Sequence, residues 1–316
     1  MLDLKRLRVL REVAERGSFS GAADSLYVSQ SAISQQISAL EAEVGVPLLL
    51  RLRSGPVLTD AGTLLVSHAD AAICRLEQAE RELAELSGLG IGDLRLASFS
   101  SASATLVTRA ARRFSDLHPE VRLSLTEADP EDSIPELKRG NTDLVLAYDF
   151  DLDELGDDRD LVLTHLIDEE MHVALPPDHR LAGESTLHLE QLAGETWLCG
   201  SSEGSCRRLT VGSCERAGFK PDVAYESNDY TVMQALVAAG MGVTLIPDLA
   251  LMLRNPEVAV VDIVPEPPIR RVWAVTLGAG SRSGATDSMI EILSGVAADV
   301  VAGVATPAVA QAAQAA

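Results

Sequence analysis

The chain has 316 residues, of which 47% are hydrophobic and 23% are charged, so it is long enough for two or three compact units and its composition excludes a disordered chain. Its 26 Lys and Arg stand against 47 Asp and Glu, and the net charge of −21 excludes a protein that binds a polyanion over its whole surface. Four Cys without a C-x-x-C pair and six scattered His exclude a disulfide framework and show no zinc-ligand spacing. We therefore expect no metal, no cofactor and a reducing, cytoplasmic location, and the first 17 residues lack the apolar run of a secretion signal.

The acidic charge is distributed unevenly along the chain. Residues 1–66 contain seven bases and seven acids, whereas the rest contains 19 bases and 40 acids. Such an asymmetry favours separate domains with separate partners. The N-terminal segment can therefore approach DNA although the whole chain is acidic.

Three short helices are predicted within residues 4–44. The first carries an apolar stripe and ends at Gly17, and Ser18 or Ser20 can cap the second, whose small inward residues allow close helix crossing. Ser29 can cap the third helix. The apolar positions of these helices are Leu4, Leu7, Leu10 and Val13, then Ala22, Ala23 and Leu26, then Ile33, Ile37, Leu40 and Val44.

The opposite face of the third helix is polar and uncharged. Ser and Gln can read base edges in a major groove, and a helix N-terminus can hold a phosphate without a formal charge. An ordinary solvated helix face is the alternative explanation. The predicted DNA-binding residues on this helix are Ser29, Gln30, Ser31, Ser34, Gln35 and Ser38.

Behind this helix, "GVPLLLRLRSGPVLTDAG" predicts two short strands about a turn at Ser54 and Gly55. Such a wing would place Arg51 and Arg53 near the DNA backbone or minor groove.

A long helix is predicted from about Ala61, with Thr59 as its cap. Its apolar residues step alternately by four and three, which is a heptad seam: Leu65, Ala69, Ala72, Leu76, Ala79, Leu83 and Leu86. The seam favours pairing with a second copy, with Leu65, Leu76, Leu83 and Leu86 at the interface; a helix lying on its own domain is the alternative. A dimer presents two recognition helices and suits a promoter with two half-sites.

Beyond the Gly-rich residues 88–93, strands and helices alternate as in a parallel α/β sheet. Ligands of such sheets bind at the carboxyl ends of the strands, near helix N-termini, which favour an anion. We therefore predict a cleft for a small anionic effector, although each polar cluster alone also fits a helix cap. The clusters are Ser100, Ser101 and Ser103, Tyr148, Ser201 and Ser202, and Ser227, Asn228 and Thr231, of which Ser100, Ser101, Tyr148, Ser201, Ser227 and Asn228 are the predicted effector-binding residues.

Residues 232–253 imitate a membrane span, because they contain a single charged residue, Asp248. Gly240, Gly242 and Pro247 break the stretch into a helix, a turn and a strand. We therefore expect a buried α/β segment and no membrane partner.

The stretch "AADSLYVSQSAISQQISALEAEVGVPLLLR" followed by "LTDAG" resembles the LysR-type transcriptional regulators, although Leu49 stands where that family usually has Phe and Ser54 where its wing often has Arg. The resemblance implies a DNA-binding regulator without catalytic activity, a homodimer or homotetramer, whose effector domain has two lobes like a periplasmic binding protein. The expected parts are a winged helix-turn-helix (1–60), a linker helix (61–87), a hinge (88–93), lobe I (94–167 and 271–301), lobe II (168–270) and a disordered tail (302–316).

Two alternative functions stay open. "GSSEG" at residues 200–204 matches the G-x-S-x-G elbow of hydrolases, but the last His, His188, precedes Ser202, whereas that fold places its catalytic His after the Ser. Cys206 and Cys214 loosely resemble the cysteine pair of the family's peroxide-sensing members. In one helix they would lie roughly 12 Å apart, against a Cα separation of at most about 7 Å in a disulfide, so oxidation would have to unwind that helix.

Overall fold

The computed structural model describes residues 2–52, 55–86, 92–150, 158, 160–201, 204–278 and 282–303. The expected hinge residues up to 91 and the expected tail beyond 303 lie outside these ranges. The chain divides into two compact units, the first containing residues 1–90 with 138–141 and the second the remainder.

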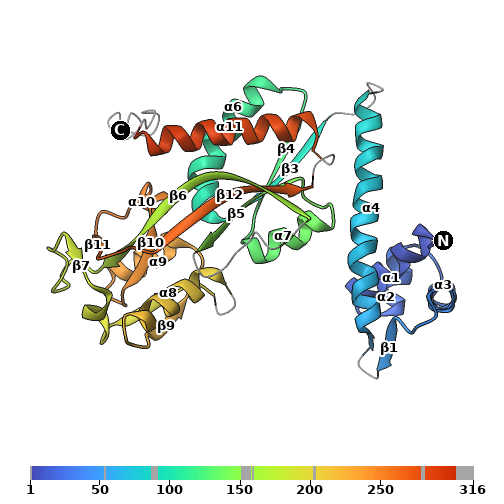
Figure 1. The fold of residues 1–316 in the computed structure, drawn as a ribbon, viewed down its shortest axis with the longest axis horizontal. Helices are drawn as coiled ribbons and strands as arrows, with labels where there is room; N and C mark the ends of the chain where they lie inside the picture. Colours follow the sequence, from blue (N-terminus) through green and yellow to red (C-terminus); the bar gives the residue numbers. More distant parts are fainter. Residues whose placement is uncertain are drawn as a thin grey trace. The chain divides into compact units, whose positions relative to one another are not determined.

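The first unit has the predicted helix-turn-helix and wing (Figure 1). Each predicted cap is present: Ser18 Oγ accepts from Gly21 N at 3.0 Å, Ser29 Oγ from Ala32 N at 3.2 Å, and Thr59 Oγ1 from Gly62 N at 3.0 Å. The elements are α1 (Leu4–Arg16), α2 (Phe19–Ser25), α3 (Gln30–Val44), β1 (Leu49–Leu52), β2 (Gly55–Leu58) and α4 (Asp60–Leu86).

The wing is an antiparallel hairpin in which Leu49 pairs with Leu58 and Leu52 with Gly55. Gly55 has φ 125°, and a Cβ there would lie 2.7 Å from the Gly17 carbonyl oxygen, so only glycine fits. The carboxylate of Glu41 in α3 accepts from the backbone N–H groups that lead into β1. The wing is thereby fixed to the recognition helix.

The core of the first unit confirms the predicted apolar stripes and extends into α4. Ala69 and Ile73 of α4 are buried in it, and Leu65 packs against it partly buried. The first turns of α4 therefore lie on their own domain. Leu65 is only partly buried there, so its place in an interface between two copies stays a prediction.

The second unit contains an eight-stranded sheet with strand order β4-β3-β5-β12-β6-β11-β7, in which β10 also pairs with β6, and a two-stranded sheet of β8 and β9. Its first part contains β3 (Asp93–Ser98), α5 (Ser100–Ala102), the π-helical turn η1 (Ser103–Val107), α6 (Thr108–Leu117), β4 (Arg122–Glu127), α7 (Pro130–Lys138), β5 (Leu144–Phe150) and β6 (Leu161–Leu175). Its second part contains β7 (Thr186–Leu187), η3 (Leu189–Leu192), β8 (Thr196–Cys199), α8 (Ser205–Arg216), β9 (Asp222–Glu226), α9 (Tyr230–Ala238), β10 (Thr244–Pro247), α10 (Asp248–Leu251), β11 (Ala259–Ile263), β12 (Ile269–Leu277) and α11 (Gly284–Val301).

The sheet is mixed, which corrects the expectation of a parallel one. β3 is parallel to β4 and β5, but β12 is antiparallel to both β5 and β6. The chain leaves lobe I along β6 and returns along β12, so these two long strands run side by side through both lobes in opposite directions (Figure 1). The expected lobe boundaries near residues 168 and 270 fall inside them.

Both faces of the sheet in lobe I are covered by helices. On β5, Leu144 and Leu146 face a core that contains Phe114 of α6 and Leu293 of α11, whereas Val145 faces Leu137 of α7. This burial on two sides explains the continuous apolar run of the strand.

The apolar residues 232–253 form parts of α9, β10 and α10, as predicted. Gly240 has φ 75° and Gly242 has φ 155°, and a Cβ on Gly242 would lie 2.6 Å from the Thr196 carbonyl oxygen. Across the described residues, every helix is too short or too polar to cross a bilayer.

One histidine ties three elements of lobe II together. His172 of β6 contacts Asp248 of α10 through Nε2 at 2.9 Å and Asp262 of β11 through Nδ1 at 2.8 Å. The hydrogen bond to Asp248 raises the pKa of His172, and half-burial opposes the shift. Only the protonated ring can donate to both carboxylates.

We therefore predict that His172→Gln lowers the melting temperature most at low pH. Because the folded pKa of His172 is raised, its stabilisation is complete below the unfolded value of about 6.5 and is lost as the pH rises through the folded value. Scanning calorimetry of the parent and the variant between pH 5 and 9 should show a difference in melting temperature that becomes smaller as the pH rises. His68→Gln, at an exposed position of α4, is the control, and a gap that is constant or widens with pH would contradict the assignment.

Candidate functional site

The polar face of α3 is exposed as predicted, and Gln30, Ser31, Gln35 and Ser38 are open to solvent. Ser29 is engaged in capping, and its Oγ also lies 2.9 Å from that of Ser31. These side chains form one neutral surface of donors and acceptors on the recognition helix.

Arg51 connects the wing to this surface. Its Nη2 donates to Ser34 Oγ at 3.4 Å, and its guanidinium lies 5.2 Å from the centre of the Phe19 ring of α2. The cation is therefore held beside the recognition face. Arg53 lies outside the described residues.

Tyr27, at the turn between α2 and α3, was missed by the sequence argument. It is 95% exposed and has φ 54°, a left-handed conformation that is costly for a residue other than glycine. A solvent-exposed aromatic ring next to the N-terminus of α3 is a candidate contact for DNA. Helical periodicity carried no signal for it, because it belongs to neither helix.

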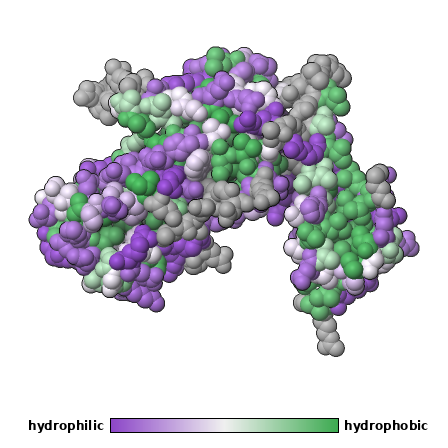
Figure 2. All heavy atoms as spheres, viewed as in Figure 1, coloured by the Kyte–Doolittle hydropathy of each residue, from purple (hydrophilic) through white to green (hydrophobic). Residues whose placement is uncertain are grey.

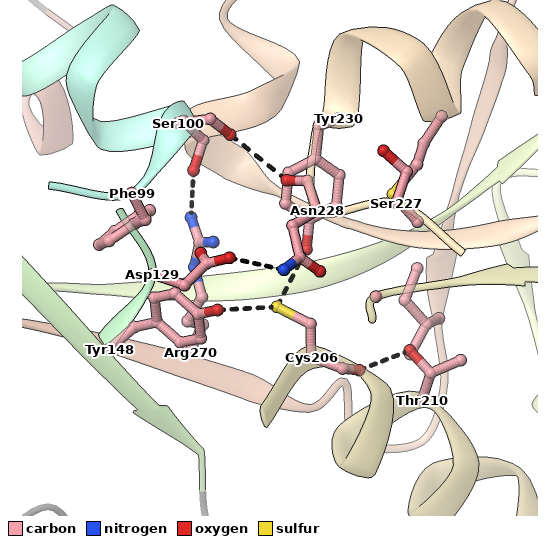
Figure 3. Close-up of a pocket in the computed structure, with 14 residues that line it drawn as sticks. Phe99, Ser100, Asp129, Tyr148, Cys206, Thr210, Ser227, Asn228, Tyr230 and Arg270 are labelled. Carbon is pink, nitrogen blue, oxygen red and sulfur yellow. Dashed lines mark hydrogen bonds between the residues drawn. The ribbon is translucent and has the colours of Figure 1, made fainter. Parts of the chain in front are cut away.

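The second site is a small cavity between the lobes of the second unit (Figure 3). Its volume is about 10 Å³, room for about one water molecule. Side chains reach it from the strand ends and helix starts of both lobes. The lining residues are Phe99, Ser100, Ser101, Asp129, Tyr148, Gly200, Cys206, Thr210, Ser227, Asn228, Tyr230, Met233, Leu245 and Arg270.

Five of the six predicted effector residues line this cavity: Ser100, Ser101, Tyr148, Ser227 and Asn228. Ser201 lies beside it and orients Asn228. The Ser201 N–H donates to Asn228 Oδ1 at 2.8 Å, and its Oγ accepts from Asn228 Nδ2 at 3.2 Å. The rule that ligands bind at the carboxyl ends of strands thus predicted residues from four separate segments that all line or border this cavity.

A buried ion pair forms the floor of the cavity. Arg270 of β12 and Glu169 of β6 are neighbours across the two strands, and Nη2 lies 2.7 Å from Oε2. The same guanidinium donates to Ser101 Oγ at 3.0 Å and lies 4.9 Å from the Phe99 ring centre. Arg270 is thus fully engaged within the protein.

Asp129 places a carboxylate in the cavity. It precedes α7 and accepts from Asn228 Nδ2 of the other lobe at 2.5 Å. Burial raises the pKa of Asp129, and the hydrogen bond from Asn228 opposes this. The carboxylate therefore carries an unrelieved cost of desolvation.

The cleft contains charges of both signs. Arg270 is the cation among the described lining residues, and Glu169 neutralises it. Asp129 adds a negative charge that the helix-dipole argument did not include. That the effector is an anion stays a prediction.

Cys206 of α8 also lines the cavity, as the sequence argument did not foresee. Its Sγ donates to the Tyr148 hydroxyl at 3.4 Å and lies 3.7 Å from that of Tyr230. Burial raises the pKa of Cys206, with the charge of Arg270 opposing, and raises that of Cys214 to about 12. Both thiols are therefore held in the protonated, less reactive form.

Comparison with known proteins identifies the two units. Residues 4–63 match the family model of the bacterial regulatory helix-turn-helix proteins of the lysR family, and residues 87–298 match the LysR substrate binding domain. The chain belongs to the LysR family of transcriptional regulators. The first unit is therefore a DNA-binding module, and the second is an effector-binding domain.

Two curated transcriptional regulators, GltC and OxyR, are similar to this LysR-family chain over most of their length. The transcriptional dual regulator GltC of Bacillus subtilis (strain 168) is 29% identical over 274 residues, 87% of this chain and 90% of GltC. The dual regulator OxyR of Escherichia coli (strain K12) is 30% identical over 285 residues, 89% of this chain and 90% of OxyR.

Solved structures share the fold of this LysR-family chain. The LysR-family regulator CbnR has a TM-score of 0.62 at 21% identity, over 94% of this chain and 99% of CbnR. A full-length OxyR variant from Pseudomonas aeruginosa has a TM-score of 0.66 at 21% identity, over 94% and 95% of the two chains.

We predict that Gln35→Ala weakens binding of this LysR-family regulator to its operator by about 1 to 3 kcal/mol, because a side chain that reads a base edge is lost. Fluorescence anisotropy with an operator duplex measures the loss, and circular dichroism should show an intact fold. Gln36→Ala removes the same side chain about 100° further round α3, away from the recognition face, and is the matched control. Equal affinities of the two variants would assign the contacts elsewhere.

Proposed function

We propose that this LysR-family protein binds a promoter with two half-sites as a homodimer or homotetramer, and that a small molecule in the cleft of its effector domain changes this binding. The observation that carries the proposal is the convergence of polar side chains from both lobes on one cavity. We further propose that it acts in the cytoplasm, where its DNA would lie, and uses no cofactor.

The exposed side of α4 supports self-association. Leu76 is 47% exposed and Leu83 65% exposed, and Figure 2 shows apolar atoms gathered along this helix. Both residues belong to the heptad seam, whereas the side chain of Leu86 lies outside the described residues. We propose that the seam pairs two copies, with Leu65, Leu76, Leu83 and Leu86 at the interface, Leu65 being partly buried against its own domain as well.

Leu76→Asp should therefore dissociate the oligomer, because pairing would bury a carboxylate in an apolar seam. Sedimentation velocity measures the mass, and a fall to half or less is expected, with loss of operator affinity. Ala71→Asp puts the same charge on an exposed position of α4 off the seam and should keep the parent mass. If Leu76→Asp also keeps the parent mass and affinity, the seam has another role.

The cleft is closed by contacts between its lobes, so an effector larger than a water molecule must part them. Ser100 Oγ donates to the Asn228 carbonyl at 3.4 Å, and Glu131 at the rim accepts from Ser205 N at 2.8 Å. These bonds stabilise one lobe arrangement. A ligand that binds another arrangement better would shift the balance, and the shift can alter the separation of the two DNA-reading modules.

We propose that the chain is not an enzyme. Histidine is absent from the described residues that line the cavity, so the cleft offers no imidazole base. Ser202 of the G-x-S-x-G sequence lies outside the described residues. The family to which the chain belongs consists of transcriptional regulators.

Thiol sensing is a second candidate, favoured by the position of Cys206 in the cavity and by relatives named as hydrogen peroxide-inducible genes activators. Two observations oppose it. The raised pKa of each thiol disfavours the thiolate, and Cys206 and Cys214 lie on one continuous helix, α8.

Ser101→Ala with Ser201→Ala should abolish the promoter response to the natural effector while binding of DNA without effector persists. The pair removes one hydroxyl that lines the cavity and one that orients Asn228, at about 0.5 to 1.5 kcal/mol each, so effector affinity should fall about fivefold or more. A reporter assay checks the response, with Ser294→Ala in α11 as a control.

Survival of the response in the double variant would contradict the cleft assignment. A response to hydrogen peroxide that Cys206→Ser removes would establish the thiol candidate in its place.

A further inference from the structure

The contacts of the Asp129 carboxylate indicate which kind of ligand the cleft would bind. Asp129 lies at the start of α7, and its backbone oxygen accepts from Asp132 N and Ser133 N. Its carboxylate instead points across the cleft to the Asn228 amide (Figure 3). An Asp in this position usually caps its own helix, so this one is turned toward the other lobe.

The hydrogen-bond partners of Asp129 are neutral. The Asn228 amide donates to it at 2.5 Å, and the Tyr148 hydroxyl is a further partner. The charges acting on it, Glu131 and Asp132, are both negative, and together with burial they raise its pKa. Among the described residues, Asp129 is thus a partly buried carboxylate whose hydrogen-bond partners carry no positive charge.

Two cations at the cleft, Arg270 and Arg208, already have partners within the protein. Arg270 is paired with Glu169 at 2.7 Å. Arg208 donates to Ser205 Oγ, which also contacts Glu131, so the rim carboxylate has a cation nearby. For Asp129, which lines the cavity, the described residues supply no such cation.

A buried carboxylate gains most from a partner that brings both N–H donors and a positive charge. A cation would also be attracted by the faces of the aromatic rings beside Asp129, those of Phe99 and Tyr148, whose centres are 4.8 Å apart. The Arg270 guanidinium already makes such cation–π contacts: it lies 4.9 Å from the centre of the Phe99 ring and 5.3 Å from that of the Tyr148 ring.

We infer that the effector is a small nitrogen base, an amine, amidine or guanidine, whose protonated N–H groups replace the Asn228 amide as donors to Asp129. The inference rests on the proposed function, since it names the ligand of the same cleft. In the closed form Asn228 acts as a neutral substitute for this ligand. Displacing it breaks one bond that holds the lobes together, which couples recognition of the ligand to lobe movement.

The first test builds the cation into the chain. Asn228→Lys places an ammonium next to Asp129, and Asn228→Met, of similar length and uncharged, is the matched control. The full-length Lys variant should melt about 3 °C above the Met variant, and the difference should vanish when both carry Asp129→Asn. A Lys variant that melts at or below the Met variant overturns the inference.

The second test uses the parent protein, so it does not depend on the folding of those variants. Its melting temperature is measured with n-butylamine, 1,4-diaminobutane and butylguanidine, and with butyrate and succinate as anions of similar size. At least one base should raise it, and the rise should be lost in Asp129→Asn but kept in Asp132→Asn, which removes an exposed charge of the same helix turn.

The outcomes separate this inference from the proposed function. If butyrate or succinate raises the melting temperature and the bases do not, the cleft binds ligands but the assigned class is wrong. A rise with bases that persists in Asp129→Asn, or no rise with any base, also overturns the inference. The requirement for Ser101 and Ser201 in the promoter response tests the proposed function independently.

Discussion

The ion pair between Arg270 and Glu169 is the interaction on which the effector domain depends. It joins β6 and β12 where both strands pass from one lobe to the other. Glu169 also accepts from Leu249 N at 2.7 Å, which attaches α10, and Arg270 reaches Ser101 at the start of α5. Both side chains are fully buried, so loss of either partner would leave an unpaired charge at a cost of about 3 to 5 kcal/mol.

The same pair sets the character of the cleft. Because Glu169 is paired with Arg270, the positive charge of this lining residue is compensated within the protein. Asp129 is then the charge that a ligand would meet. The lobe crossing and the compensated charge of Arg270 therefore both depend on these two strands.

An acidic chain can bind DNA because its charge is segregated. Residues 1–66 have no net charge, and their recognition face offers hydroxyl and amide groups with Arg51 beside them. Two copies double these contacts, and their linkage raises the effective concentration of the second module. The acidic effector domain then limits non-specific binding to other DNA, since a polyanion is repelled from it.

Short sequence patterns correctly predicted the features that depend on residues close together in the chain. Caps at Ser18, Ser29 and Thr59 and the apolar stripes of the first helices depend on neighbouring residues only, and all appear as expected. Polar residues at strand ends predicted most of the cleft, because the rule needs only the order of strands and helices along the chain.

Predictions failed where the answer depended on distant residues. The mixed sheet follows from the return of the chain along β12, which no local pattern records. Asp129 follows a strand just as Ser100 does and could have been included by the same rule. An Arg at the start of the apolar "RRVWAVTL" strand was a signal for a buried charge, but its partner Glu169 is 101 residues away.

The central claim is that the cleft and the DNA-binding face communicate, and thermodynamic linkage tests it directly. If a cleft ligand changes operator affinity by some factor, operator DNA must change ligand affinity by the same factor. The measurement is calorimetric titration of a cleft ligand into the full chain, with and without a saturating operator duplex. We predict dissociation constants that differ by about 5-fold or more, and equal constants would contradict the claim.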